Sequence, residues 1–392
     1  MNRMFKIGLI AFLGIGVTVG VVAWHARTPA AGQHAVSATA KSGHGNIRLI
    51  ATGDMLPHDT VNQAAHRQDG SYDYLPLFDQ VKPYLTSGDI RFCNQESPSA
   101  GSFGVSGYPT FNAPPQFAKD LSSLGCNVIN LANNHANDKE QSGIDQTRGL
   151  WNQLHPLAVA GTNRSADEQN QIATFKAGGL TFAFLSYAEC SNDTYLTDYG
   201  VNILSKDLAS RQIAAAKQSA DIIIVGTHWC NENTDVPDAT QQDWAKYLAD
   251  QGVTVVIGTG PHYLQPVSRL NRAGGGQTVV WYSLGNFLST QEDIEGLIGG
   301  IAVMDIDPST KAVTGVGFMP TYMHYEWTAE QKANENYLAR KNLKIYPLDQ
   351  AEAALARSQN HTTVDAQTQR VTALMNRYTS TTMLTSNTAL SR

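Results

Sequence analysis

The amino-acid sequence predicts an α/β fold in which β-strands are covered by helices. Short apolar runs alternate with amphipathic stretches from residue 47 onward, as in chains where strands and helices alternate. Several apolar runs are continuous, which is typical of strands that are buried on both faces. A unit of helix, glycine and strand also occurs twice, and this repetition of one pattern supports the same fold class.

The first half of the folded region contains three expected strands and one clear helix. Phe117, Leu121 and Leu124 recur at helical spacing, and Gly125 stands where that helix is expected to stop. The expected strands are IRLIATGD, DIRFCNQE and CNVINLANNH, at residues 47–54, 89–96 and 126–135.

The second half repeats the pattern. Trp244, Tyr247 and Leu248 share one face of an expected helix at 241–252, and Gly252 marks its end. Further strands are expected at 180–190, 220–230, 253–260 and 278–288, with a late antiparallel pair at 299–307 and 312–320.

The last part of the chain, residues 327–392, is polar and rich in Ala, Gln and Thr. Stretches such as TAEQKANENYLARKN and AEAALARSQ favour helices. We therefore expect peripheral helices and a tail around a domain at 47–326.

The N-terminus has the pattern of a membrane anchor. Arg3 and Lys6 precede an uncharged apolar run at 7–24, and a bilayer span needs roughly 17 to 25 residues. The positive-inside rule keeps residues 1–6 in the cytoplasm and exports the rest, which gives a single-pass cell-membrane protein. The alternative is secretion after signal cleavage, with SATA at 37–40 as a late site. Small polar residues at 25–46 read as a flexible tether.

Composition limits the classes of function. With 42% hydrophobic and 16% charged residues the chain can bury a full core, and a formal charge of -6 does not indicate nucleic acid as a partner. The four cysteines lack any CxxC spacing, which excludes a zinc ribbon. The turn GTGPH lacks the Gly-Lys-Ser/Thr ending of a phosphate-binding loop, and Pro261 removes a backbone donor that such a loop would use.

Five of the expected strands end in side chains that can bind metal or transfer protons. In open α/β sheets such residues converge at the carboxyl ends of the strands. Asp, Glu, Asn and His together form a mixed oxygen and nitrogen ligand set that suits one or two ions of Mn, Fe or Zn. Singly, each has an ordinary structural explanation such as a helix cap or a turn. The five positions are Asp54, Glu96, Asn134 with His135, His228, and His262.

Six segments occur in a characteristic order and spacing, namely ATGDMLPHD, FCNQESP, INLANNHANDKEQSGIDQT, VGTHWCNEN, VVIGTGPHYLQPV and WYSLGNFL. In these segments the chain resembles the bacterial capsule-synthesis CapA family, also called the poly-γ-glutamate synthesis PgsA-like proteins. The likeness covers roughly residues 47 to 290. It implies a metallophosphatase-like sandwich of two β-sheets flanked by helices, in a membrane-anchored, extracytoplasmic protein.

The resemblance also implies roles for individual residues. His135 would be the general acid for the leaving group, and Asp138 would orient its imidazole. Water activated by the metal would attack a phosphoester-like or amide-like centre. The implied ligands are Asp54, Glu96 as a bridge between ions, Asn134, His228 and His262, and the implied supporting residues are Asn133, Glu232 and Asn286.

Three departures from the family pattern put a full metal site in doubt. Cys230 replaces a glycine, Lys139 and Glu140 replace a Tyr-Gly pair, and Gly260 stands where a histidine ligand is usual. We expect one metal position to be weak, empty or served by a substitute.

The substitute ligands are His58 and the Cys230 thiolate. A Cys190–Cys230 disulfide is an alternative use of Cys230, with Cys93–Cys126 as a second pair, and buried free thiols are the third alternative.

These observations lead to one functional hypothesis and two alternatives. The leading one is an anchored protein of capsule or poly-γ-glutamate synthesis with a divalent-metal hydrolase or transferase site. Its partners would be a cell-surface polymer or its precursors, the membrane through residues 7–24, and other polymer-synthesis proteins. The alternatives are a non-catalytic polymer-binding scaffold with a degraded metal site, and a secreted metallophosphoesterase.

Overall fold

A computed structural model describes residues 39–40, 45–193 and 195–390 of the chain. The predicted anchor at 7–24 and most of the predicted tether lie outside these residues. Within the described part of the chain, no helix is both long and apolar enough to cross a membrane. All described residues fall in one compact unit, Val36–Arg392.

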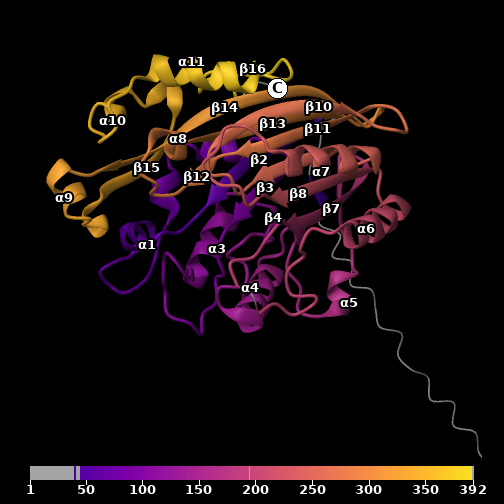
Figure 1. The fold of residues 1–392 in the computed structure, drawn as a ribbon, viewed down its shortest axis with the longest axis horizontal. Helices are drawn as coiled ribbons and strands as arrows, with labels where there is room; N and C mark the ends of the chain where they lie inside the picture. The colour runs from indigo at the N-terminus through magenta and orange to yellow at the C-terminus, as the bar shows by residue number, and fades with distance from the viewer. Residues whose placement is uncertain (1–38, 41–44, 194, 391–392) are drawn as a thin grey trace, which may run out of the picture. The chain divides into compact units, whose positions relative to one another are not determined.

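Two β-sheets form the centre of this unit (Figure 1). The seven-stranded sheet has, in order, β1 (Thr39–Ala40), β6 (Ala173–Ala177), β7 (Leu180–Ala188), β8 (Ile222–His228), β9 (Val255–Thr259), β11 (Gln277–Leu284) and β10 (Leu264–Asn271). Strands β7, β8, β9 and β11 are parallel to one another. Strand β10 is antiparallel to β11, and β6 is antiparallel to β7 but parallel to β1.

The nine-stranded sheet combines parallel and antiparallel halves. Strands β2 to β5 are parallel, whereas β13, β14 and β15 pair antiparallel. Its order is β15 (Lys341–Pro347), β14 (Ala312–Glu326), β13 (Ile298–Asp307), β2 (Ile47–Met55), β3 (Ile90–Gln95), β4 (Val128–Asn130) and β5 (Ala158–Ala160), with β12 (Asn286–Leu288) beside β2 and β16 (Thr382–Met383) beside β14.

Aromatic side chains join the two sheets face to face. The rings of Phe92 on β3 and Phe184 on β7 meet edge to face at 5.9 Å. Trp281 on β11 contacts Phe318 on β14 at 5.7 Å, and its indole N–H points at the Met304 sulfur on β13. All five side chains are buried, so the main apolar core lies between the sheets.

Helices cover the outer faces. The long ones are α3 (Pro115–Ser123), α4 (Glu140–Leu154), α6 (Lys206–Ser219), α7 (Ala239–Asp250) and α11 (Val364–Met375). Helices α6 and α7 bury a second apolar cluster against β7, β8, β9 and β11. The shorter ones are α1 (Asp59–Ala65), α2 (Lys82–Leu85), α5 (Ala166–Gln169), α8 (Ile294–Leu297), α9 (Ala329–Ala333) and α10 (Glu352–Leu355), with 3-10 turns η1 (Leu75–Phe78), η2 (Tyr337–Ala339) and η3 (Leu348–Gln350).

Local signals explain where the predicted helices start and stop. Helix α7 begins at a capping box in which Asp238 accepts from the Gln241 amide and the Gln241 side chain accepts from the Asp238 amide. It ends two residues before Gly252, and α3 ends two residues before Gly125, as predicted. The prediction of an antiparallel pair at 299–307 and 312–320 is also confirmed, as β13 and β14.

Two predicted strands are shorter than expected. The run 126–135 forms strand only at β4, because Asn133 accepts a hydrogen bond from the His135 amide and turns the chain out of the sheet. The run 278–288 divides at Gly285, where φ is +63°. The chain leaves the seven-stranded sheet there and joins the nine-stranded sheet as β12.

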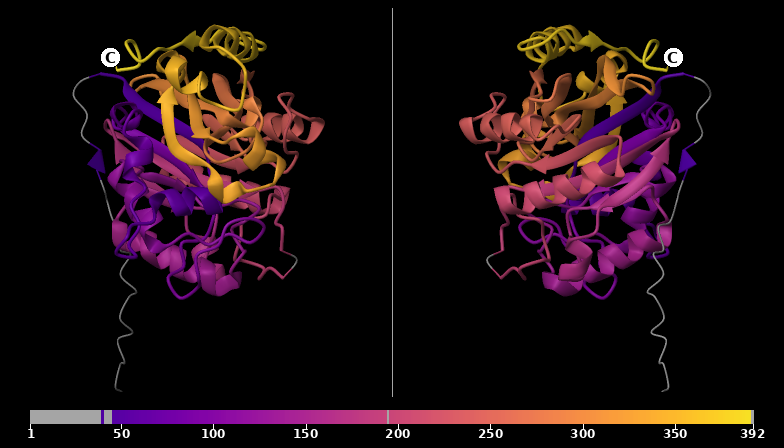
Figure 2. Two further views of the ribbon diagram at one scale, coloured as in Figure 1. Left: turned by 90° about the vertical axis from the view of Figure 1, so that its left-hand side faces the viewer. Right: turned by 90° about the vertical axis from the view of Figure 1, so that its right-hand side faces the viewer.

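The expectation of helices and a tail at 327–392 was incomplete. Helices α9, α10 and α11 lie in this segment, but Lys341–Pro347 forms β15, which pairs with β14 in the main sheet. Alternating burial of Leu343, Ile345 and Pro347 explains why a strand forms here. Figure 2 shows the yellow C-terminal segment running along the orange strands in both views.

Candidate functional site

Four of the predicted strand-end residues lie at or just after the carboxyl ends of parallel strands in the two sheets. Asp54 is the penultimate residue of β2, Glu96 directly follows β3, and His228 ends β8. His262 lies in the turn after β9. Because the two sheets face each other, these residues come together although up to 208 positions separate them in sequence.

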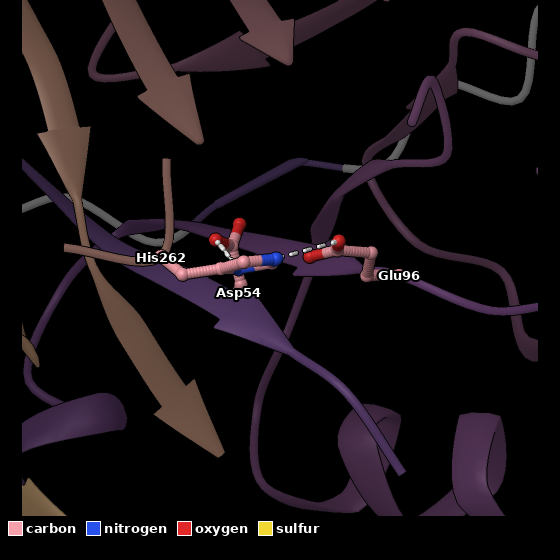
Figure 3. A group of neighbouring side chains, drawn as sticks. All are labelled: Asp54, Glu96 and His262. Carbon is pink, nitrogen blue, oxygen red and sulfur yellow. Dashed lines mark hydrogen bonds and ion pairs between the residues drawn. The ribbon is translucent and has the colours of Figure 1, made fainter. Parts of the chain in front are cut away.

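Asp54, Glu96 and His262 form a buried triad (Figure 3). One ligand atom from each residue lies within 4.8 Å of the others. His262 Nδ1 is 3.0 Å from Asp54 Oδ2, and its Nε2 is 4.0 Å from Glu96 Oε1. Two carboxylates and an imidazole at this spacing can hold a divalent cation.

His228 extends the triad through Glu96. Its Nε2 lies 3.7 Å from Glu96 Oε1, and its Nδ1 is 3.2 Å from the Thr259 hydroxyl. That hydroxyl donates its one proton to the Thr227 carbonyl, so it accepts from Nδ1–H of His228. Burial lowers the pKa of His228 to about 3, which keeps the ring neutral. The Nε2 lone pair therefore faces Glu96.

Glu96 Oε1 is a buried acceptor with no hydrogen-bond partner among the residues that the structure describes. Burial, followed by the charge of Asp54, raises the pKa of Glu96 well above its usual range. An unpaired buried acceptor beside an imidazole lone pair is costly unless a positive group lies between them. The donor set at this point therefore fits a cation.

Asp54 and His262 have pKa values that shift in opposite directions. Burial opposes the charge on both residues, but the hydrogen bond and charge pairing between them outweigh it. The pKa of Asp54 is lowered and that of His262 is raised. Asp54 also accepts from the Gly260 amide, with both carboxylate oxygens 3.1 Å away.

Gly260 contributes to the site through its backbone. Its φ is +103°, and a Cβ there would lie 2.1 Å from the Trp229 carbonyl oxygen. A side chain does not fit this position, whereas the amide contributes a hydrogen bond to Asp54. Gly260, which replaces the histidine of the family pattern, thus lies in a turn whose conformation requires glycine at this position.

His135 and Asp138 form a second pair. His135 Nδ1 is 2.8 Å from Asp138 Oδ2, and the Phe111 amide donates to the same oxygen at 2.6 Å. The Phe111 ring meets the imidazole edge to face at 4.5 Å. The Asn192 amide nitrogen lies 3.3 Å from His135 Nε2. The structure thus places Asp138 where it can orient His135, and their catalytic roles stay predictions.

The remaining predicted residues surround these groups. Asn133 donates to the Gln95 carbonyl, Asn286 donates its amide to the His262 carbonyl, and Glu232 lies 3.8 Å from His262 Nε2. Asn134 contacts Asn192, and its buried Oδ1 has no partner among the described residues. The role of Asn134 as a ligand stays a prediction.

Neither proposed substitute ligand joins the triad. Cys230 is bonded to Cys190, so a Cys230 thiolate ligand and a free thiol are both wrong. Cys93 and Cys126 form the other disulfide, and no cysteine is free. His58 Nδ1 instead accepts from the Thr290 amide at 3.3 Å.

Several polar residues near the site were missed from the sequence. Asn94 donates to Asp54 Oδ1 at 2.9 Å, and Asn130 donates to Asn94 Oδ1 at 2.8 Å. The Ser186 hydroxyl donates to Asn130 Oδ1, so this series of hydrogen bonds extends into the other sheet. The available signal was a polar side chain inside an otherwise apolar strand, as in RFCNQE and NVINL.

Comparison with known proteins identifies the chain's relatives. Residues 48–291, more than half of the chain, match the family described as bacterial capsule synthesis protein PGA_cap. The chain belongs to the PGA_cap family. The match has nearly the bounds of the resemblance that the motifs predicted.

Two PGA_cap relatives come from Bacillus. The PGA biosynthesis protein CapA of Bacillus subtilis is 32% identical over 222 residues, which are 55% of this chain and 57% of that protein. The capsule biosynthesis protein CapA of Bacillus anthracis is 26% identical over 295 residues, covering 71% of this chain and 67% of that protein. This PGA_cap chain thus spans little more than half the length of the Bacillus subtilis relative.

A solved structure of a phosphatase from Mycoplasma pneumoniae aligns with this PGA_cap chain at a TM-score of 0.43 and 14% identity. The alignment covers 70% of this chain and 93% of the phosphatase.

Proposed function

We propose that this PGA_cap protein is a metal-dependent hydrolase or transferase that acts in the synthesis of a capsule or poly-γ-glutamate surface polymer. In this proposal the two-sheet sandwich is a metallophosphatase-type scaffold for the site. It is supported by family membership and by the buried triad Asp54, Glu96 and His262.

One observation carries the proposal. Glu96 Oε1 has no hydrogen-bond partner among the described residues, and it faces imidazole nitrogens of His228 at 3.7 Å and His262 at 4.0 Å. Acceptors and lone pairs that converge in a buried place are stabilised by a cation. Asp54, Glu96, His228 and His262 would hold a Mn, Fe or Zn ion, and Asn134 is the candidate for a further ligand.

A divalent ion in this place would supply Lewis-acid chemistry to a phosphoester or amide. Residues of the chain would supply the negative charge and the proton transfer. Asp54 stays ionised because the Gly260 amide and His262 stabilise its charge. His135 would move a proton at Nε2, because Asp138 holds its Nδ1.

The location and partners belong to the same proposal. Residues 7–24 would anchor the protein in the cell membrane, with the domain outside the cytoplasm. There it would meet the surface polymer or its precursors and other proteins of polymer synthesis. Both disulfides support an oxidising compartment, in which such bonds persist.

The test combines metal content with turnover. We expect the purified protein to retain Mn, Fe or Zn in elemental analysis and to cleave phosphate monoesters, phosphate diesters or γ-glutamyl amides. The variant His135→Ala should lose turnover by about 100-fold or more while keeping its metal. The matched control is His361→Ala, since His361 is exposed.

A negative result would be equally clear. If the protein holds no metal, turns over none of these substrates, and His135→Ala restores polymer production in a deletion strain as well as the wild type, the enzymatic function is wrong. Turnover of small phosphate esters with no effect of deletion on the envelope would instead indicate a general phosphoesterase.

A further inference from the structure

A polar cavity lies away from the triad, where the edge strand β5 meets β6 and β7. Its volume is about 130 Å³, which is room for several waters or for a molecule of a few non-hydrogen atoms. Gln171 on its rim is exposed, so the cavity is reached from solvent. Ser186 lines it, and three hydrogen bonds through Asn130 and Asn94 separate that residue from Asp54.

Arg148 on α4 is the main charged group of the lining. Its side chain is only 9% exposed, and one guanidinium nitrogen donates to Glu168 Oε1 at 2.7 Å. The other two nitrogens, Nε and Nη1, are buried with no partner among the described residues. A buried cation with two unpaired donors is unfavourable unless an acceptor comes close to it.

The carboxylate of Glu168 pairs with two arginines. It also accepts from the Arg164 amide at 2.6 Å and from the Arg164 guanidinium at 3.1 Å. Burial opposes the charge of Glu168, but the two arginines outweigh it and hold its pKa below the usual range. Two cations therefore share one anion, which leaves a net charge of +1 over Arg148, Arg164 and Glu168, with Arg164 half-exposed outside the lining.

Gln212 on α6 adds an acceptor to the lining. Its Nε2 donates to the Gln169 carbonyl at 2.6 Å, and this bond fixes which end of the amide is oxygen. The Oε1 atom is buried with no partner among the described residues. Two residues of the lining thus carry buried, unsatisfied polar atoms, the donors of Arg148 and the acceptor of Gln212.

Hydrogen bonds hold the rest of the wall in place. Asn202 donates to the Ser186 carbonyl at 3.2 Å and accepts from Asn163 at 2.9 Å and Gln169 at 3.2 Å. Asn163 also donates to the Tyr199 carbonyl at 2.7 Å. A wall fixed in this way loses little freedom when a ligand binds.

We propose that this cavity is a second ligand site, which binds a small monocarboxylate that also carries a hydroxyl or amino group. The carboxylate accepts from Arg148, and the hydroxyl or amino group donates to Gln212 Oε1. The cavity volume limits the ligand to the size of lactate or alanine. This site is independent of the metal function proposed above.

Calorimetric titration of the full-length protein, treated with a chelator, tests the proposal with three matched probes. We expect saturable binding of lactate, about tenfold weaker binding of propionate, which lacks the hydroxyl, and no binding of lactamide, which lacks the carboxylate. The Glu96→Gln variant should bind lactate like the wild type, which separates this cavity from the metal site. Equal binding of all three probes, tighter binding of inorganic phosphate, or no binding would overturn the proposal.

Two substitutions on one helix locate the binding. Gln212→Glu places a negative charge in the lining and should weaken lactate binding about tenfold or more, because like charges repel. Gln218→Glu is the same change at an exposed position of α6 and should leave the affinity unchanged. Gln212→Met removes the acceptor without adding charge and should abolish the preference for lactate over propionate, which keeps the test valid if Gln212→Glu does not fold. Unchanged affinity in both Gln212 variants would exclude this cavity.

Discussion

Glu96 is fully buried, and burial, followed by the charge of Asp54, raises its pKa well above the usual range, which favours the protonated carboxyl when no cation is bound. Glutamine has nearly the shape of a protonated glutamic acid. We therefore expect Glu96→Gln to change the free energy of unfolding of the metal-free protein by no more than about 0.5 kcal/mol. The same variant should lose the stabilisation that added Mn or Zn gives, about 3 kcal/mol at 100 times the dissociation constant.

Urea denaturation with and without metal measures both effects. Glu352→Gln, at an exposed position, is the matched control and should respond to metal like the wild type. If metal stabilises Glu96→Gln as much as the wild type, Glu96 is not a ligand.

His58 makes stability depend on pH. Burial, followed by the charges of His262 and Arg340, lowers its pKa from 6.5 to about 3. Between these values the unfolded chain binds a proton that the folded chain does not, so stability falls as pH falls below 6.5. His58→Asn retains an acceptor for the Thr290 amide and should reduce the slope by up to about 1.4 kcal/mol per pH unit.

The measurement is the free energy of unfolding at several pH values below 7. His361→Asn, at an exposed position, should leave the slope as in the wild type. A slope in His58→Asn that equals the wild-type slope would show that His58 titrates normally in the folded protein.

At the scale of elements, the turn after β9 is tightly constrained by its neighbours at the triad. It places the Gly260 amide on Asp54 with φ at +103° and leaves no room for a side chain beside Trp229. We expect Gly260→Ala to lower the free energy of unfolding by at least about 2 kcal/mol. Gly104→Ala, where a Cβ meets nothing within 4 Å, should stay within about 0.5 kcal/mol of the wild type. Equal stability of the two variants in urea would contradict the strain at Gly260.

The sequence predicted elements well where local signals decide them. Apolar runs and glycine stops located β2, β7, β8, β9 and the helices α3 and α7. It missed β15, because a strand that is stable only when paired with β14 has little preference for the strand conformation in its own sequence. The ends of the expected strands include all three residues of the triad. Asn94 depends on a contact between the neighbouring strands β3 and β2, and the backbone role of Gly260 depends on a contact between the two sheets. No local sequence pattern contains either contact.

At the scale of the molecule, the C-terminal segment completes the domain. Arg340 lies over the rings of Trp327, Tyr325 and Tyr337, at 4.2, 4.9 and 5.0 Å, and pairs with Glu292 at 3.1 Å. Helix α11 adds Val371, Leu374 and Met375 to the main core. This segment therefore contacts the loop after β12 and contributes to the main core.

We expect a protein truncated after residue 326 to fail to fold, because it exposes the β14 edge and part of the core. Size-exclusion chromatography and circular dichroism would show aggregation and loss of the cooperative thermal transition. Removal of residues 391–392 alone is the control. A monomeric truncated protein with a wild-type transition would make residues 327–392 dispensable.

The two disulfides also determine how simply the chain can be oxidised. Four cysteines allow three complete pairings, and the structure has the one in which each cysteine bonds to the next along the chain, Cys93 to Cys126 and Cys190 to Cys230. When such a chain emerges N-terminus first, both cysteines of the first pair are available before either cysteine of the second pair appears. An oxidant that joins thiols in their order of appearance therefore makes the native bonds, with no need for an isomerase to reshuffle them.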